Sequence, residues 1–417
     1  MHFLRKHMKE YSNNFLQLGL VKDICFAVAD RGYKEPTQIQ KSAIPLLLNN
    51  NDLIGVAQTG TGKTASFTLP LLNKLFLNKV NRDNGIRSLI LVPTRELAIQ
   101  VGENVKHYNK YIKLKINTVL GGVNINPQMI SLRGGADILI ATPGRLLDLF
   151  DKNAINFKCL ETLVLDEADK LLDLGFEDEL NRIHSLLPNK VQTVMFSATF
   201  SNSINLLSSK FLKDPVEVRI EEEVTTAEGI NEWLYPVDKS KKNLLLLELI
   251  HTNSWDKVLV FAKSQNRVDR LVRFLENKGV NVDSIHGKKT QFARTETLDK
   301  FKGGKTRVLV ATDIASRGID ISKLPVVVNY DMPHVAENYI HRIGRTGRAG
   351  NSGLAISFCC EDEFDDLIKV EHLLQTHITR ELIVGFEPKS SLKTSPRIKP
   401  LKPKKPKKKK SKTQNIS

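Results

Sequence analysis

The sequence predicts an α/β protein with two tandem doubly wound domains, each built on a parallel sheet. Two stretches of the chain repeat the same order of a short apolar segment, a turn and an amphipathic segment. Runs such as LILV, ILIA, TLVL, VLVF and VLVA are apolar throughout, which is typical of parallel strands that helices cover on both faces. A length of 417 residues also exceeds one ordinary domain and suits two domains with additional segments.

Each predicted strand is a short apolar run that lies between turn residues. In the first stretch these runs are Leu53–Val56, Ser88–Val92, Asn117–Leu120, Asp137–Ala141, Thr162–Asp166 and Thr193–Phe196. In the second stretch they are Lys257–Phe261, Val282–Ile285, Arg307–Ala311, Val326–Asn329 and Ala355–Phe358. Helices are expected between successive strands, because parallel strands need crossover connections.

Changes in composition mark the domain boundaries. We assign residues 1–215 to the first domain and residues 230–386 to the second. The segment 216–229 is acidic and lacks a helical apolar period, so it is predicted to connect the two domains. Residues 387–417 are rich in Pro and Lys and almost free of apolar residues, so this tail is predicted to be disordered.

The positive charge is concentrated in the tail. Residues 388–417 hold eleven Lys and one Arg without Asp or Glu, which is +12 of the formal net charge of +16. A polyanion is the natural partner of such a segment. Nucleic acid is favoured over a membrane, because no amphipathic or lipidated segment accompanies the basic run.

Membrane and disulfide-dependent classes are not favoured. No apolar run approaches the roughly 20 residues that span a bilayer. The N-terminal sequence MHFLRKHMKEYSNNF lacks the apolar core of a secretory signal. We therefore expect a cytoplasmic protein with reduced cysteines. The cysteines, which lack metal-ligand spacing, are Cys25, Cys159, Cys359 and Cys360.

A predicted phosphate-binding loop, AQTGTGKT, directly follows the first predicted strand and precedes an apolar helical segment. Its glycines let backbone amides point at phosphates, Lys63 can reach the terminal phosphates, and the hydroxyl of Thr64 can bind Mg²⁺. The strict pattern starts with Gly, whereas this loop starts with the small residue Ala57. The nucleotide-binding residues are Ala57, Gln58, Thr59, Gly60, Thr61, Gly62, Lys63 and Thr64.

A pair of carboxylates, Asp166 and Glu167, ends the later strand TLVL. Asp166 can hold Mg²⁺ through water, and Glu167 can accept a proton from the water that attacks the terminal phosphate. In isolation, such a pair is more often a solvated strand end. Together with the phosphate-binding loop, it favours a site that hydrolyses a nucleoside triphosphate.

With this loop and the tetrad DEAD at Asp166–Asp169, the chain resembles the DEAD-box RNA helicases of helicase superfamily 2. The resemblance extends over roughly residues 13–380 and is to a bacterial-type core with a basic tail. It implies two RecA-like domains with an interdomain cleft that closes on ATP. It also implies an ATP-dependent RNA helicase that uses ATP and Mg²⁺ and hydrolyses ATP slowly until RNA stabilises the closed form.

The segment GYKEPTQIQ at residues 32–40 resembles the family's adenine-reading motif. The resemblance implies that Tyr33 stacks on adenine, that Gln40 bonds its edge, and that Phe15 belongs to the same site. A side-chain amide can pair with the N6/N7 edge of adenine and reject guanine, so ATP is favoured over GTP.

HRIGRTGRAG at residues 341–350 brings two arginines, Arg345 and Arg348, to a glycine-containing helix end. The resemblance implies that they reach the γ-phosphate, where such arginines contribute about 10³–10⁵ in rate in other NTPases. It also implies that Asp320 contacts the ribose and that Gly318 lies near the phosphates. The implied residues of domain coupling are Asp169, Ser197, Thr199, Arg317 and His341.

Several short motifs at strand ends combine cations, hydroxyls and glycines, a chemistry that suits phosphates better than base edges. By resemblance they line a groove that grips the RNA backbone without sequence preference. Aromatic residues are 6% of the chain, so base stacking is not indicated. The implied RNA-binding residues are Pro93, Thr94, Arg95, Gly121, Gly122, Thr142, Pro143, Gly144, Arg145, Gly287, Gln291, Arg294, Thr312 and Asp313.

Other interpretations remain open at this stage. The chain can instead be a DNA-directed helicase or translocase, or an ATP-gated RNA clamp that does not unwind. The basic tail is expected to tether RNA, with a solubility tail and a nuclear-import signal as alternatives. We expect a monomer that acts in ribosome assembly or RNA turnover, and that does not bind membranes.

Overall fold

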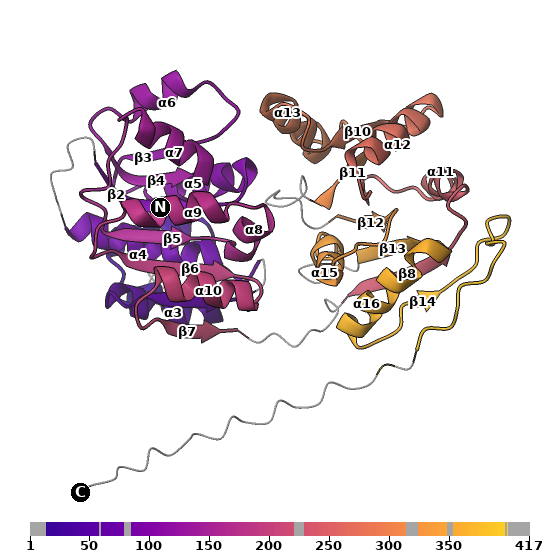
Figure 1. Ribbon diagram of the computed structural model, residues 1–417, viewed down its shortest axis with the longest axis horizontal. Coiled ribbons are helices and arrows are strands. Elements are labelled where there is room, and N and C mark those ends of the chain that lie inside the picture. The colour runs from indigo at the N-terminus through magenta and orange to yellow at the C-terminus, as the bar shows by residue number, and fades with distance from the viewer. Residues whose placement is uncertain are drawn as a thin grey trace, which may run out of the picture. The chain divides into compact units, whose positions relative to one another are not determined.

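Two parallel sheets of seven strands each organise the described parts of the chain (Figure 1). The computed structural model describes residues 14–57, 60–78, 85–220, 229–313, 324–347, 353–396 and 398. Described residues up to Ile220 form one compact unit, and those from Gly229 onward form the other. The predicted α/β class with two doubly wound parallel sheets is thereby confirmed.

The first unit alternates strands and helices along the chain. Its strands are β1 (Leu53–Val56), β2 (Ile86–Leu91), β3 (Ile116–Val119), β4 (Ala136–Ala141), β5 (Thr162–Leu165), β6 (Gln192–Ser197) and β7 (Val216–Arg219). Its helices are α2 (Lys22–Asp30), α3 (Gln38–Leu48), α4 (Lys63–Leu77), α5 (Arg95–Tyr108), α6 (Ile125–Ser131), α7 (Pro143–Asp151), α8 (Ala168–Asp173), α9 (Glu177–Leu186) and α10 (Asn202–Phe211). The strand order across the sheet is β3-β4-β2-β5-β6-β1-β7.

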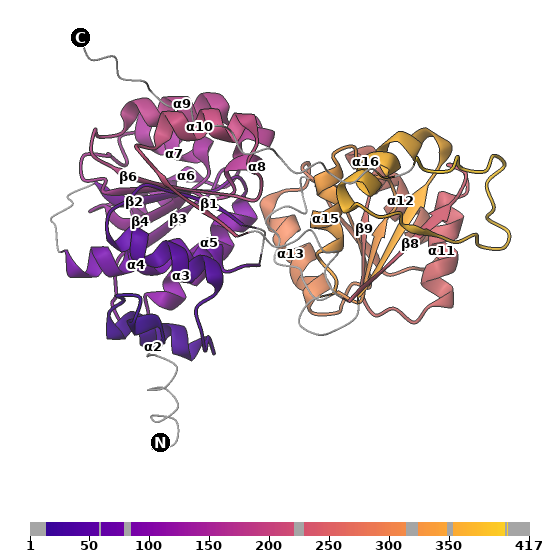
Figure 2. The same cartoon turned by 90° about the horizontal axis from the view of Figure 1, so that it is seen from below.

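Helices cover both faces of the first sheet. Helices α3 and α4 lie on one face, and α7, α9 and α10 lie on the other (Figure 2). Strand β2 shows why its apolar run is continuous. Ile90 packs into the core under α2–α5, whereas Leu89 and Leu91 pack into the core under α7–α10. Because side chains alternate along a strand, burial on both faces favours apolar residues at successive positions such as Leu89, Ile90 and Leu91.

The second unit repeats the plan. Its strands are β8 (Ile230–Pro236), β9 (Val258–Phe261), β10 (Val282–Ile285), β11 (Val308–Ala311), β12 (Val326–Asn329), β13 (Gly353–Cys359) and β14 (Thr379–Arg380). Its described helices are α11 (Lys242–Thr252), α12 (Gln265–Asn277), α13 (Gln291–Lys302), α15 (Ala336–Ile343), the 3₁₀ helix η1 (Glu361–Glu363) and α16 (Phe364–Leu374). The strand order is β10-β11-β9-β12-β13-β8-β14. Helices α11 and α12 pack on one core, and α15 and α16 pack on another.

Most predicted strands are confirmed with small shifts at their ends, and Leu53–Val56, Val282–Ile285 and Val326–Asn329 have the predicted bounds. Strands β7, β8 and β14 were not predicted. The predicted connector 216–229 therefore begins too early, since β7 pairs in parallel with β1. Its sequence VEVR alternates apolar and charged residues, as expected of an edge strand with one buried side chain.

The predicted disorder of residues 387–417 is wrong for the first part of this segment. Arg380 donates to the carbonyl of Lys393 (2.8 Å) and to the hydroxyl of Ser395 (2.6 Å). The amide of Lys389 donates to Asp238 (3.1 Å), and Leu392 packs against the core under α15 and α16. These contacts fix residues 389–395 on the second unit, although their composition resembles that of the basic residues that follow.

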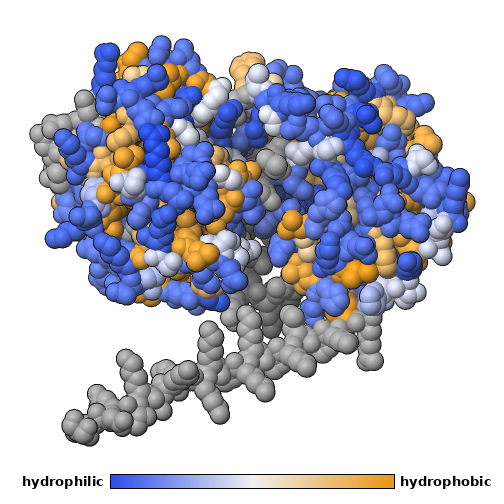
Figure 3. All heavy atoms as spheres, viewed as in Figure 1, coloured by the Kyte–Doolittle hydropathy of each residue, from blue (hydrophilic) through white to orange (hydrophobic). Residues whose placement is uncertain are grey.

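The surface seen in Figure 3 is mostly hydrophilic, with scattered apolar residues, as is usual for a folded chain. None of the described helices combines the length and apolarity that crossing a membrane requires.

Candidate active site

The phosphate-binding loop connects β1 to α4, and α4 begins at Lys63. Gly60 and Gly62 have φ of 94° and 97°, a left-handed backbone that favours glycine. Gly62 is also packed closely, because a Cβ at this position would lie 2.5 Å from Nε2 of Gln40. Two of the predicted loop residues, Gln58 and Thr59, lie outside the described residues.

Lys63 is buried, and its Nζ donates to the carbonyl of Ala57 (2.8 Å). The amide of Ala57 in turn donates to the carbonyl of Ser197 at the end of β6 (3.1 Å). The lysine therefore points back into the loop from the first turn of α4, where the unpaired amides of a helix start favour an anion.

The adenine-reading motif lies beside the loop. Gln40 in α3 is 3% exposed; its Nε2 donates to the carbonyl of Gly62 (3.1 Å) and its Oε1 accepts from the amide of Thr37 (3.0 Å). Tyr33 is 38% exposed, so part of its side chain is accessible to a ligand. Phe15 has no exposed surface and packs in the core. In this conformation Phe15 can therefore support the motif but not contact a nucleotide.

The carboxylates of the DEAD tetrad follow β5, two strands away from β1 in the sheet. Asp166 is 3% exposed and Glu167 is 5% exposed. Burial raises the pKa of Asp166 to about 7, the nearby charge of Glu167 adds to this, and Lys63 opposes it. Glu167 has φ of 53°, an uncommon backbone for a residue other than glycine, and it precedes the first residue of α8.

Lys170 was not predicted as a site residue. It is 4% exposed, and its Nζ donates to Oε1 of Glu167 (2.7 Å). Oε2 of Glu167 is buried without a hydrogen-bond partner. Sequence offered one signal, a lysine one helical turn after Glu167, but such spacing is usually a surface pair.

Asp169, one of the residues implied in domain coupling, contacts the segment at the end of β6. Its Oδ2 accepts from the amides of Ala198 (3.0 Å) and Thr199 (3.2 Å) and from the hydroxyl of Thr199 (3.4 Å). The hydroxyl of Ser197 instead accepts from the amide of Thr199 (3.2 Å). The segment SAT is thus held to the DEAD tetrad mainly through its backbone.

Three of the predicted RNA motifs meet at one edge of the first sheet. Strands β3, β4 and β2 are neighbours, and each motif follows the carboxyl end of one of them. The guanidinium of Arg95 packs against Gly122, where a Cβ would lie 2.2 Å from Nη2. A Cβ on Gly121 would lie 3.9 Å from the hydroxyl of Thr142. The residues gathered here are Pro93, Thr94, Arg95, Gly121, Gly122, Thr142, Pro143, Gly144 and Arg145.

Two of these residues also have local structural bonds. The hydroxyl of Thr94 caps α5 by accepting from the amide of Leu97 (3.2 Å). Arg145 is 8% exposed, donates through Nη2 to the carbonyl of Val123 (2.9 Å), and keeps Nη1 without a hydrogen bond. A capping role and a ligand role are therefore compatible at this edge.

In the second unit, Thr312 and Asp313 follow β11, and Gly287 follows its neighbour β10. Arg294 lies on α13, and the hydroxyl of Thr290 caps that helix (3.3 Å to the amide of Ala293). Within the same motif, QFAR, Phe292 is 80% exposed. Stacking was not expected in these motifs, so this aromatic side chain was overlooked. Gln291 begins α13, but its side chain is outside the description.

Arg342 is the second residue that sequence reasoning missed. It is 2% exposed and donates from Nε and Nη2 to both oxygens of Asp313 (2.6 and 2.8 Å). Nη1 donates to the carbonyl of Asp331 (2.7 Å) and to Asn329 (3.2 Å), and the guanidinium lies 5.1 Å from the ring centroid of Phe261. The motif HRIGRTGR holds three arginines, of which only Arg345 and Arg348 were predicted to belong to a site.

His341 lies in α15 and Arg345 just beyond its end. Gly347, with φ of 61°, packs against Ile230, so the turn after α15 requires a glycine. Four further predicted residues lie outside the described residues; these are Arg317, Gly318, Asp320 and Arg348.

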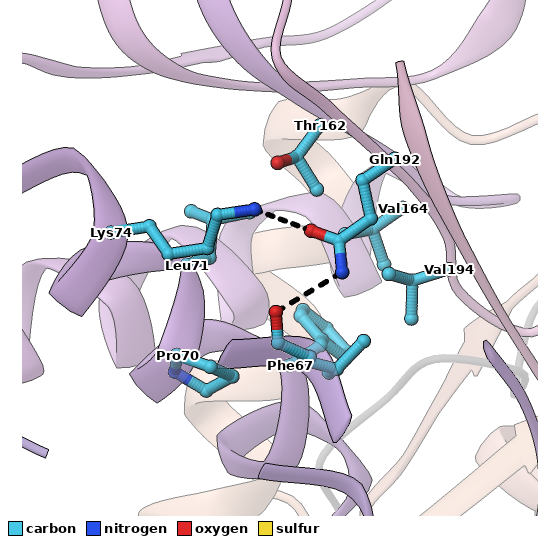
Figure 4. A pocket seen from close by; sticks show the side chains of 9 residues that line it. Phe67, Pro70, Leu71, Lys74, Thr162, Val164, Gln192 and Val194 are labelled. Carbon is cyan, nitrogen blue, oxygen red and sulfur yellow. Dashed lines mark hydrogen bonds between the residues drawn. The ribbon is translucent and has the colours of Figure 1, made fainter. Parts of the chain in front are cut away.

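A small pocket lies away from these motifs, between α4 and strands β5 and β6 (Figure 4). Lys74 donates to Oε1 of Gln192 (2.6 Å), whose Nε2 donates to the carbonyl of Leu47 (3.1 Å). Burial lowers the pKa of Lys74. The walls of the pocket are mainly apolar, and the pocket has room for about one water molecule, so it is not a nucleotide site.

Two family models match the chain, the DEAD/DEAH box helicase model over residues 37–207 and the helicase conserved C-terminal domain model over residues 241–350. The chain is 39% identical over 366 residues to "DEAD-box ATP-dependent RNA helicase CshA" of Bacillus cereus, covering 88% of this chain and 69% of the relative. It is 42% identical over 359 residues to "ATP-dependent RNA helicase CshA" of Listeria monocytogenes, covering 86% and 68%.

Solved structures agree with the sequence comparisons. "DEAD-box helicase Mss116 bound to ssRNA and UDP-BeF" has a TM-score of 0.80 at 28% identity, covering 89% of this chain and 80% of that one. S. cerevisiae Dbp5 bound to RNA and ADP BeF3 has a TM-score of 0.78 at 31% identity, covering 88% and 95%. With both RecA-like domains matched and the DEAD tetrad beside the phosphate-binding loop, the chain belongs to the DEAD-box ATP-dependent RNA helicases, which hydrolyse ATP.

Proposed function

We propose that the protein is an RNA-stimulated ATPase that couples hydrolysis to closure of its two domains, and so unwinds or remodels short RNA duplexes and RNA–protein complexes. The observation that carries this proposal is the buried DEAD tetrad, which joins the phosphate-binding loop to the end of β6. Asp166 lies close enough to Lys63 of that loop for the lysine to oppose the rise in its pKa, and Asp169 binds Ala198 and Thr199. A change at the nucleotide can therefore be transmitted to the SAT segment.

The residues at this site suit Mg²⁺. Asp166 has a raised pKa because it is buried beside a second carboxylate, so a bound cation would stabilise its charged form. Asp166 and the hydroxyl of Thr64 are the side chains that would hold the ion, and the phosphates would complete its shell. When bound, Mg²⁺ would neutralise the charge that develops on the phosphates.

The other nucleotide roles follow from position. Lys63 would leave the carbonyl of Ala57 to pair with the terminal phosphates, and Glu167 would accept a proton from the attacking water. Tyr33 would stack on adenine, and the second amide hydrogen of Gln40 would bond its edge. Arg345 and Arg348 would stabilise the transferring phosphoryl group from the second domain.

RNA would be held by its backbone. In the first domain the grip would come from the motifs that meet at β3, β4 and β2. In the second it would come from Gly287, Gln291, Arg294 and Thr312, with Asp313 held by Arg342. Cations, hydroxyls and glycines can recognise phosphates and 2′-hydroxyls without reading sequence.

ATPase assays with RNA and DNA of one sequence test this function. We expect RNA to stimulate hydrolysis and DNA not to, and we expect Glu167→Gln to remove the stimulated activity while ATP binding remains. Equal stimulation by DNA would favour a DNA helicase or translocase. RNA-stimulated hydrolysis without strand separation of a short duplex would favour an ATP-gated RNA clamp.

Ribosomal RNA is the substrate class that we favour. A relative at 37% identity over 389 residues, from Sclerotinia sclerotiorum, is described as "ATP-dependent rRNA helicase rrp3", and it covers 91% of this chain. Crosslinking the protein to RNA in its own cells tests this substrate class against messenger-RNA turnover. We further propose a monomer, which sedimentation in the presence of ATP and RNA would test.

A further inference from the structure

Lys170 is a buried cation in the middle of the candidate active site. Its Nζ lies 2.7 Å from Oε1 of Glu167, and the side chains of this pair are 6% and 7% exposed. Its backbone amide donates to Oδ1 of Asp169 (2.9 Å). One residue thus touches the carboxylate proposed to accept the water's proton and the carboxylate that binds the SAT segment.

The bond from Lys170 makes the two oxygens of Glu167 different. Oε1 accepts from Lys170, whereas Oε2 is buried and has no hydrogen-bond partner. A buried carboxylate oxygen without a partner is costly, and such groups persist where a ligand supplies the missing donor. The attacking water is a donor of the right kind, because it must lose a proton to a nearby acceptor.

We propose that Lys170 is a positioning residue for ATP hydrolysis, which binds Oε1 of Glu167 and thereby leaves Oε2 as the acceptor of the water's proton. In this step the water oxygen forms a bond to the γ-phosphorus, and its proton passes to Oε2. The bond between the γ-phosphorus and the oxygen that bridges to the β-phosphate breaks, and ADP leaves. This inference depends on the proposed role of Glu167.

Backbone geometry supports a positioning role over simple charge balance. Glu167 has φ of 53°, a conformation that an ordinary residue adopts only where surrounding contacts hold it. The bond between the side chains of Lys170 and Glu167 links two residues that are one helical turn apart. It therefore restrains both the carboxylate of Glu167 and the strained backbone of that residue. Lys63 does not take this role, because its Nζ is bonded to the carbonyl of Ala57.

The test compares Lys170→Met with Lys170→Arg in RNA-stimulated ATP hydrolysis by the full chain. We expect Lys170→Met to lower kcat by about 10- to 100-fold, below the 10²–10⁴ of a lost general base, with KM for ATP and the RNA concentration for half-stimulation nearly unchanged. Lys170→Arg should recover most of kcat because it keeps a charged donor. Binding of a fluorescent ADP should not change in either variant.

A double variant separates positioning from other effects. If Lys170 acts through Glu167, adding Lys170→Met to Glu167→Gln should cause no further loss of kcat. Lys74→Met is the matched control, since Lys74 is another largely buried lysine of the first unit with one side-chain partner, and its kcat should equal that of the wild type. Lys170→Ala makes the same prediction and leaves room for water, should the methionine variant fail to fold.

The outcomes divide clearly. A kcat within twofold of the wild type for Lys170→Met and Lys170→Ala, with the kcat of Glu167→Gln lowered by about 10²–10⁴ but still measurable, overturns the positioning role of Lys170. Multiplicative losses in the double variant also overturn it, because Lys170 would then act elsewhere. If Glu167→Gln itself keeps full activity, the proposed role of Glu167 fails, which is a different result.

Discussion

The two units share one strand plan but use charge at their strand ends in opposite ways. In the first unit, Asp166 and Glu167 are buried beside Lys63 and Lys170, and one oxygen of Glu167 has no hydrogen-bond partner among the described residues. In the second unit, Asp313 is bound through both oxygens by Arg342, and Asp331 lies 3.4 Å from the fully buried Lys242. The first unit thus leaves a carboxylate oxygen available to a ligand, whereas the described acids Asp313 and Asp331 of the second unit are bonded to cations of that unit. Fold alone therefore does not determine where the reactive groups lie.

The largest expected effect tests the first half of this comparison. Asp166→Asn should lower RNA-stimulated ATP hydrolysis by about 10²–10⁴, equivalent to roughly 3–5 kcal/mol in the barrier. Its stability without Mg²⁺ should not fall. The folded pKa of about 7 lies above the usual value, so charging Asp166 costs stability as pH rises from about 4 to about 7, and the neutral amide avoids this cost.

Thermal melts of both proteins at pH 5 and pH 8, in EDTA, measure this effect. The melting temperature of the variant should equal or exceed that of the wild type at pH 8, with a smaller difference at pH 5. A variant that is much less stable at pH 8 would show that Asp166 is internally paired, like the acids of the second unit.

Arg342→Ala tests the second half. Removing one partner of a buried pair typically costs about 3–5 kcal/mol, because Asp313 would keep an uncompensated charge. Chemical denaturation of the full chain should show earlier unfolding of the second unit, monitored by Trp233 and Trp255, which both lie in that unit. Lys239→Ala, which breaks an exposed pair with Asp362, is the control and should leave the midpoint of denaturation nearly unchanged.

Gly62→Ala should have a smaller effect, which combines a loss of stability with a loss of nucleotide binding. The left-handed φ of 97° costs about 1–2 kcal/mol for a residue with a Cβ, and that Cβ would push against Gln40. We expect a moderate loss of stability and weaker ATP binding by isothermal titration. Gly134→Ala, at a φ of 75° where an added Cβ would meet no atom within 4 Å, separates the backbone cost from the contact with Gln40.

Truncation after Pro396 should change affinity for RNA without changing catalysis. The removed residues carry most of the basic tail, and each phosphate contact contributes about −0.7 to the slope of log affinity against log salt for single strands. The variant should therefore show a shallower slope and an unchanged kcat at saturating RNA. An unchanged slope would rule out the RNA tether and favour a solubility tail.

Lys74→Met should have the smallest effect. Burial lowers the pKa of Lys74, so the fold gains little from its charge, and the apolar side chain suits the walls of the pocket. Loss of the bond to Gln192 opposes this gain. Denaturation should show a change in stability of about 1 kcal/mol or less.

Much of this molecule could be predicted from its sequence because the signals were local. Continuous apolar runs predicted the central strands. Short motifs at the ends of these strands predicted the phosphate-binding loop, the DEAD tetrad and the residues that gather beside β3, β4 and β2. Strand β7 was missed because its alternating VEVR pattern is that of an exposed edge. Lys170 and Arg342 were missed for another reason, since a sequence does not show which charged side chains become buried or which partner each one meets.

The bond between Arg380 and Ser395 sets the origin of the basic tail. A tether's reach is measured from its last fixed point, and a chain extends at most about 3.3–3.6 Å per residue. The 21 residues of 397–417 have a contour length of roughly 70 Å at full extension. If this segment binds RNA, as its charge predicts, that RNA would be kept at a high effective concentration around the second unit.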